Sequence, residues 1–197
     1  MVRRRRARAP RSRAGRGDVD STMTHPLHDV PTGPNPPREL TAFIEIPRGS
    51  RNKYELDKDT GILKLDRILY AAVHYPGDYG FLPRTLGDDG DPLDILAMTT
   101  EPTFPGCLVT VRPVGVFLME DEKGADEKIL TVPVADPLRR EILELDDVAP
   151  HYLDEIRHFF TVYKDLEGKR VRTMGWEGRE TAERLILEAV DRYASSR

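Results

Sequence analysis

The stretch GDDGDPLDIL, Gly87 to Leu96, places four aspartates within seven positions and then continues into an apolar segment. Carboxylates that lie a few ångströms apart repel one another unless one is protonated or a cation lies between them. The apolar residues of LDILAMT, 93–99, predict a strand that enters a core. The stretch therefore predicts carboxylates held at the edge of a core. They would form either a proton-sharing pair or a site for a hard divalent cation such as Mg²⁺.

Further short strands are predicted on both sides of this stretch. Alternating apolar residues separated by Gly and Pro predict strands over 41–47, 81–86, 107–120 and 128–134, and a hairpin over 52–69 that turns at 58–61. The period then changes, because 150–168 and 178–196 carry apolar residues at helical spacing, with Gly168 as a stop. Strands followed by helices predict a mainly β (α+β) fold, a small barrel or sandwich covered by two C-terminal helices.

The two ends of the chain differ in charge. Residues 1–17 hold eight arginines and no acid, so the other 22 of the 30 basic residues face all 34 acidic residues over 18–197. We interpret 1–38 as a disordered Arg/Pro-rich leader and 39–197 as one domain, with Met23 as an alternative start. The leader suggests a nucleic-acid arm or a transit peptide. The acidic domain instead favours a leader without a function, which results from a start assigned upstream of the true initiator.

Cysteine count and hydropathy limit the location and the kind of protein. Cys107 is the single cysteine, which excludes an internal disulfide and a Cys-based zinc site. The sequence contains no apolar run of 18 residues. We therefore expect a cytoplasmic protein without a membrane partner.

A second acidic cluster lies in MEDEKGADEKIL, 119–130, around Gly124. A turn there would bring Asp121 and Asp126 together, although such a cluster is commonly a solvated hairpin tip. An EF-hand loop over 89–100 does not fit, since its fifth, sixth and twelfth positions are Leu93, Asp94 and Thr100.

Basic and phenolic side chains are interspersed with these acids. Lys53 precedes Glu55, Arg67 follows Asp66, and Tyr163 precedes Lys164. Each has an ordinary alternative as a surface charge or a half-buried tyrosine. A plain calcium site would not need basic and phenolic side chains so close to its acids.

Taken together, six blocks make the sequence resemble the soluble family I inorganic pyrophosphatases of bacterial type. The blocks are IEIPRGSRNKYELD, LDRILY, YPGDYGFLPRTLGDDGDPLDIL, RPVGVFLMEDEKGADEKIL, HFFTVYKDLE and GW. They follow the order and spacing of that family from about residue 41 to 195. Family II enzymes do not fit, because the sequence has no DHH motif.

The resemblance implies a closed five-stranded barrel of OB type with flanking helices, which hydrolyses pyrophosphate to two phosphates with several Mg²⁺ ions. It implies that Asp91 takes the proton from the attacking water. It also implies a homo-hexamer. The implied metal ligands are Asp89, Asp94, Asp121, Asp126, Glu45 and Glu55. The implied phosphate-binding residues are Lys53, Arg67, Tyr79, Lys128, Tyr163 and Lys164, with Tyr75 beside them.

Two other functions remain open from the residues alone. A nucleic-acid-binding barrel of OB type would suit the arginine leader, but it needs a basic groove with exposed aromatic side chains. A relative that kept the fold and binds a divalent cation without turnover is the second. The acidic domain disfavours the first, so we expect no nucleic-acid partner, and the full set of candidate ligands disfavours the second.

Overall fold

The computed structural model describes residues 24–122 and 124–197. Within these residues five strands close a ring in the order β1, β4, β5, β8 and β6, because β6 also pairs with β1. The strands of the ring are β1 (Leu40–Ile46), β4 (Asp78–Phe81), β5 (Asp94–Ala97), β6 (Leu108–Asp121) and β8 (Lys128–Pro133). This closed ring, followed by two helices, confirms the predicted fold class.

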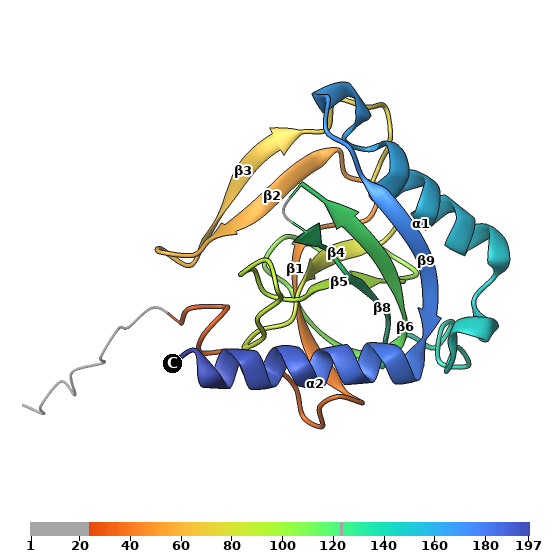
Figure 1. The fold of residues 1–197 in the computed structure, drawn as a ribbon. Helices are drawn as coiled ribbons and strands as arrows, with labels where there is room; N and C mark the ends of the chain where they lie inside the picture. Colours follow the sequence, from red (N-terminus) through yellow and green to blue (C-terminus); the bar gives the residue numbers. More distant parts are fainter. Residues whose placement is uncertain (1–23, 123) are drawn as a thin grey trace, which may run out of the picture.

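The remaining elements surround the ring (Figure 1). Strands β2 (Asn52–Asp57) and β3 (Ile62–Ile68) form a separate antiparallel hairpin, which lies above the ring in the figure, while the last helix crosses below it. The others are β7 (Gly124–Ala125), η1 (Leu145–Asp147), α1 (Pro150–Val162), η2 (Asp165–Glu167), β9 (Arg172–Gly178) and α2 (Arg179–Ser195).

The ring strands are buried on both faces. Along β5, Ile95 packs in the cluster that contains Ile186 of α2, while Leu96 packs in the cluster that contains Phe160 of α1. Successive side chains of a strand point to opposite faces, so each helix covers one set of alternating residues. This double burial explains why the sequence of β5 is continuously apolar after Asp94.

Three local predictions need correction. The strand predicted over 81–86 lies earlier in the sequence, as β4, which ends at Phe81. No predicted strand corresponds to β9. The helical spacing over 150–168 predicts a helix that continues to Gly168, but α1 ends at Val162, and the Leu166 side chain beyond it is exposed. Gly168 does adopt a left-handed conformation, with φ of 71°, at the end of η2 rather than of α1.

The described part of the predicted leader contacts the domain. Leu27 is buried against Phe43, Leu56 and Phe81, although the composition of 24–38 predicts no packed structure there. The two apolar residues of this Pro-rich segment, Leu27 and Val30, give no periodic signal, so this contact could not be predicted from the sequence. The rest of the leader, 1–23, lies outside the described residues, and its disorder stays a prediction.

Candidate active site

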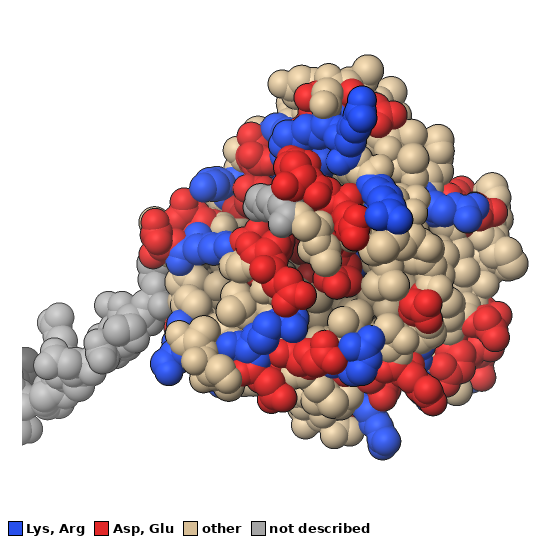
Figure 2. Space-filling model, in the orientation of Figure 1, with Lys and Arg blue, Asp and Glu red and all other residues tan. Residues whose placement is uncertain are grey.

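One cavity of about 370 Å³ opens beside the hairpin and the ring. Figure 2 shows acidic side chains around a hollow in this face, with lysine and arginine side chains near its edge. All thirteen residues predicted for the site line this cavity. They are Glu45, Lys53, Glu55, Arg67, Tyr79, Asp89, Asp91, Asp94, Asp121, Asp126, Lys128, Tyr163 and Lys164.

The strand topology explains why distant residues meet here. Asp94 begins β5 and Lys128 begins β8, and these parallel neighbours pair Asp94 with Lys128. Parallel strands that begin together place their first side chains at the same end of the ring. Asp121 ends the antiparallel strand β6 and therefore reaches this end as well.

The loop between β4 and β5 holds Asp89 and Asp91 through backbone contacts. The Gly87 amide donates to the Asp91 carbonyl at 2.7 Å, and the Asp91 amide donates to Asp89 Oδ1 at 3.0 Å. Gly90 has a φ of +82°, a conformation that other residues rarely adopt. The two carboxylates are therefore placed by a specific turn.

Asp88 of the same loop has no predicted role in the site. It does not line the cavity, and it lies 3.4 Å from Arg192 Nη1.

A buried lysine joins two of the acids. Lys128 Nζ donates to Asp94 Oδ2 at 2.6 Å and also to Asp126, while the Tyr79 hydroxyl donates to the same Asp94 oxygen at 2.5 Å. Burial alone lowers the pKa of the Lys128 ammonium, but Asp94 and Asp126 outweigh it and raise that pKa above its usual range. Lys128 therefore stays charged.

Two carboxyl groups of the cavity are held in surroundings that oppose their ionisation. Burial raises the pKa of Glu45 to about 8, with Asp94 adding to the effect, although the Leu56 amide donates to Glu45 Oε1 at 2.7 Å and opposes it. Burial likewise raises the pKa of Asp126, despite its contact with Lys128. Both groups would ionise more readily beside an added cation.

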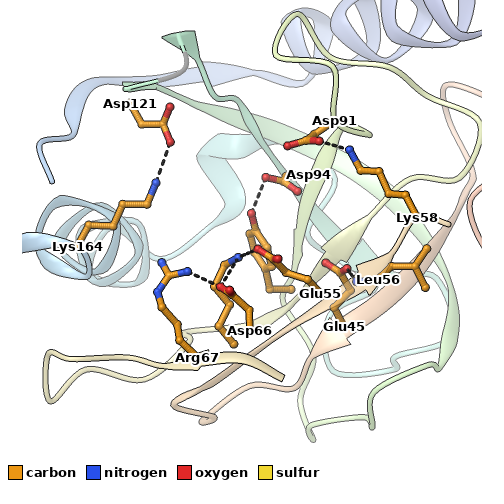
Figure 3. A network of polar contacts seen from close by, with 12 residues as sticks. Glu45, Glu55, Leu56, Lys58, Asp66, Arg67, Asp91, Asp94, Asp121 and Lys164 are labelled. Carbon is orange, nitrogen blue, oxygen red and sulfur yellow. Dashed lines mark hydrogen bonds and ion pairs between the residues drawn. The ribbon is translucent and has the colours of Figure 1, made fainter. Parts of the chain in front are cut away.

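The other cationic side chains are also paired with acids (Figure 3). Lys164 Nζ lies 2.7 Å from Asp121 Oδ2, and both side chains are largely buried. Arg67 Nε donates to Glu167 Oε1 at 2.9 Å, and its guanidinium also pairs with Asp66. Lys53 pairs with Glu55. The cavity therefore carries both signs of charge in close contact.

The chemistry of this donor set fits hard divalent cations, since its candidate ligands are all carboxylate oxygens. Within residues 24–122 and 124–197, no three His, Cys, Asp or Glu side chains already converge on one point. Lysine ammonium groups lie against Asp94, Asp121 and Asp126 instead. A cation that enters would take over carboxylate oxygens that these lysines now hold.

Comparison with known proteins identifies the family. Residues 42–194 match the family model described as inorganic pyrophosphatase. The chain belongs to the inorganic pyrophosphatase family. The inorganic pyrophosphatase of Methanosarcina acetivorans is 56% identical over 153 residues, which are 78% of this chain and 91% of that protein. That of Geobacillus stearothermophilus is 54% identical over 154 residues, 78% of this chain and 93% of that protein.

A solved structure agrees with this assignment. The crystal structure of the inorganic pyrophosphatase from Thermus thermophilus superimposes with a TM-score of 0.83 at 46% identity. The superposition covers 86% of this chain and 99% of that one. Family membership and the closed ring therefore support each other. No helix in the described part of this pyrophosphatase-family chain is long and apolar enough to cross a membrane.

The structure adds residues to the site that the sequence did not single out. Lys58, Lys169 and Tyr54 also line the cavity of this pyrophosphatase-family chain, and the Lys58 ammonium pairs with Asp91. On the sequence Lys58 resembles any surface charge next to a turn, and its partner is 33 positions away. Tyr75 lies beside Tyr79, with ring centroids 5.3 Å apart, but it is buried in the core and does not line the cavity.

Proposed function

We propose that this chain hydrolyses inorganic pyrophosphate to two orthophosphates in the cavity described above, with several Mg²⁺ ions bound. The observation that carries the proposal is that one cavity gathers five aspartates and six lysine and arginine side chains. The aspartates are Asp89, Asp91, Asp94, Asp121 and Asp126. Family membership over 42–194 supports the same reaction.

The carboxylates are the proposed metal ligands. Asp89, Asp94, Asp121 and Asp126 would hold Mg²⁺ directly, and Glu45 and Glu55 would act mainly through water molecules. Bound Mg²⁺ lowers the pKa of a coordinated water and offsets the negative charge of pyrophosphate. The raised pKa values of Glu45 and Asp126 support this assignment, because a cation would favour the ionised form of both groups.

The side chains of the chain itself supply the proton transfer and the binding of phosphate. Asp91 accepts a proton from the attacking water, whose oxygen forms a bond to one phosphorus while the bond from that phosphorus to the bridging oxygen breaks. Lys53, Arg67, Lys128 and Lys164 neutralise phosphate oxygens, including those of the phosphate that leaves.

The tyrosines donate hydrogen bonds rather than accept protons. Burial raises the pKa of Tyr79 and of Tyr163, so both hydroxyls stay protonated near neutral pH. Each can therefore donate to a phosphate oxygen and fix its position, although Tyr79 must first release Asp94 Oδ2, to which its hydroxyl now donates.

We also propose a cytoplasmic homo-hexamer. Several large apolar side chains are exposed on the described single chain, which supports burial in an assembly. They include Leu138, Leu166, Phe104 and Tyr70. Light scattering tests the assembly, and a monomer at working concentration would contradict it.

Phosphate release from pyrophosphate tests the reaction. The wild type and Asp91→Asn are assayed with Mg²⁺ and with EDTA, and Mg²⁺ binding is followed by calorimetry. We expect release only with Mg²⁺, and a loss of at least about 100-fold in kcat for Asp91→Asn with Mg²⁺ binding largely kept. A metal-saturated wild type that leaves pyrophosphate intact would instead indicate a non-catalytic cation-binding barrel. Retention on DNA without turnover would indicate a nucleic-acid-binding one.

A further inference from the structure

The tip of the β2–β3 hairpin contacts the loop that carries Asp91. Lys58 directly follows β2, and its ammonium group pairs with the Asp91 carboxylate across the cavity. Figure 3 shows the two side chains extended toward each other from separate parts of the chain. The hairpin therefore contributes a contact to the side chain that the proposed function makes the proton acceptor.

His25 holds the hairpin tip from the other side. Its Nε2–H donates to the Lys58 carbonyl oxygen at 3.0 Å. Its ring lies so close to the hairpin turn that a Cβ atom at Gly61 would be 2.9 Å from Cδ2 of the imidazole. The main chain of Lys58 is thus fixed by a residue that precedes the five-stranded ring in the sequence.

The turn that carries His25 is itself anchored. The His25 amide donates to Asp29 Oδ2 at 2.6 Å, and Leu27 is buried between the hairpin and the ring. Arg84 Nε donates to the His28 carbonyl at 2.9 Å, and His28 Nδ1 lies 2.8 Å from the Tyr193 hydroxyl of α2. Residues 25–29 therefore join the hairpin tip to the segment before the Asp91 loop and to α2.

The contacts within the loop act on a different part of Asp91. The hydrogen bonds from the Gly87 amide to Asp91 and from the Asp91 amide to Asp89 fix the Asp91 backbone. The contact with Lys58 acts on the carboxylate oxygen Oδ1. Backbone and carboxylate are thus oriented by separate parts of the structure.

We propose that Lys58 is a positioning residue for Asp91, and that His25 supports it by fixing the hairpin tip. The proposal rests on the proposed function, in which Asp91 accepts the proton. A carboxylate transfers a proton efficiently only when its oxygen is oriented toward the donor, and the Lys58 ammonium selects one orientation of the Asp91 side chain.

Because the Lys58–Asp91 ion pair is exposed, an effect of Lys58 on catalysis can be measured apart from any effect on folding stability. The Lys58 and Asp91 side chains are 48% and 38% exposed, and exposed ion pairs contribute little to folding stability. Lys58 variants should therefore fold normally. Lys64 offers a matched control, because it lies in the same hairpin, is 56% exposed and pairs with Asp57, but does not line the cavity.

Steady-state kinetics with pyrophosphate and Mg²⁺ tests the role of Lys58. We expect Lys58→Met to lower kcat about tenfold with KM changed less than about twofold, and Lys58→Arg to recover most of kcat. Lys64→Met should leave both constants unchanged. An unchanged kcat in Lys58→Met would overturn the proposal. So would a raised KM with kcat kept, which would make Lys58 a substrate-binding residue.

A double-mutant cycle tests the role of His25. We expect His25→Ala to lower kcat about threefold, and the double variant His25→Ala/Lys58→Met to be no slower than Lys58→Met alone. This result follows if His25 acts only through Lys58. If the losses of kcat in the two single variants multiply in the double variant, His25 does not act through Lys58 and its support role is overturned.

Hydrogen exchange in EDTA gives a readout that does not depend on activity. We expect the Gly87 amide, which donates to the Asp91 carbonyl, to exchange at the same rate in Lys58→Met, Lys64→Met and the wild type, because Lys58 contacts the carboxylate rather than the backbone of Asp91. Faster exchange in Lys58→Met alone would overturn the proposal, because Lys58 would then hold the loop backbone. A wild type without turnover would overturn the proposed function and this role together. An active wild type with an equally active Lys58→Met would overturn this role alone.

Discussion

The ammonium group of Lys128 lies 2.6 Å from Asp94 Oδ2 at a point where only 3% of the lysine side chain is exposed. The same group also pairs with Asp126. Asp94 and Lys128 begin two parallel strands of the ring, so this ion pair joins the strands where they line the cavity. Lys128 thereby offsets the repulsion between two acids that are also proposed metal ligands.

Substitution Lys128→Met should destabilise the metal-free protein. It leaves two neighbouring carboxylates without their buried cation, and breaking a buried pair costs about 3 kcal/mol. Urea unfolding in EDTA measures the loss, and Mg²⁺ should restore part of it by taking the place of the ammonium. The exposed control Lys64→Met should lose far less stability. Wild-type stability of Lys128→Met in EDTA would contradict this account of the pair.

Glu45 should make the stability of the metal-free protein depend on pH. Its pKa in the folded protein is about 8, above its ordinary value of 4.5. The folded state therefore binds this proton more tightly than the unfolded state, so the free energy of unfolding falls as pH rises from about 4.5 to 8. At pH 7 the free energy of unfolding is therefore about 3 kcal/mol lower than below pH 4.5, since one pKa unit corresponds to about 1.4 kcal/mol.

Substitution Glu45→Gln removes that proton equilibrium but keeps an oxygen that can accept from the Leu56 amide. We expect the variant to be more stable than the wild type at pH 7 in EDTA, and to show a flatter pH dependence. Urea titrations at pH 5, 6, 7 and 8 measure both effects. Glu141→Gln is the control, because the Glu141 side chain is 88% exposed. If the free energy of unfolding depends on pH in the same way for the wild type and Glu45→Gln, Glu45 does not cause the pH dependence.

Gly80 permits the close pairing of β4 with β1. A Cβ atom at this position would lie 1.9 Å from the Phe43 carbonyl oxygen and 2.9 Å from Ile44 Cα. Backbone atoms of a paired strand cannot yield as a side chain does, so Gly80→Ala should cost at least about 3 kcal/mol. Thermal unfolding measures the loss. Gly178→Ser is the control, since the space there is open and serine favours the N-cap of α2. Equal losses in both variants would refute the steric argument.

The elements that the sequence predicts well are those with a regular apolar period. Strands β1, β5, β6 and β8 and both helices lie where alternation or helical spacing indicates them. Strand β9 escapes this reasoning, because RTMGWEG holds only two apolar side chains, Met174 and Trp176, which is too short a pattern to predict a strand. Its one described neighbour is β6. The shift of β4 has a similar cause, since Gly80 contributes no side chain to a strand of only four residues.

The thirteen residues predicted for the site all line one cavity, while their individual roles stay predictions that come from the resemblance to the family. Their meeting in one cavity follows from the closed ring. Lys58 is the informative exception. Its role depends on the direction in which the hairpin tip extends, and the contact with His25 depends on a segment without any periodic pattern. Contacts of this kind are set by tertiary packing, which the local sequence does not encode.

The start of the chain should affect turnover only where residues contact the cavity. The first described residue that lines it is Leu27, and His25 contacts the hairpin tip. A chain that begins at Met23 should therefore keep the kcat and KM of the full chain. A chain that begins at Val30 should lose kcat at least about threefold, because it lacks both residues. Steady-state phosphate release compares the three forms, with thermal unfolding to confirm that each is folded. Reduced turnover of the Met23 form would instead assign a function to the arginines that precede it.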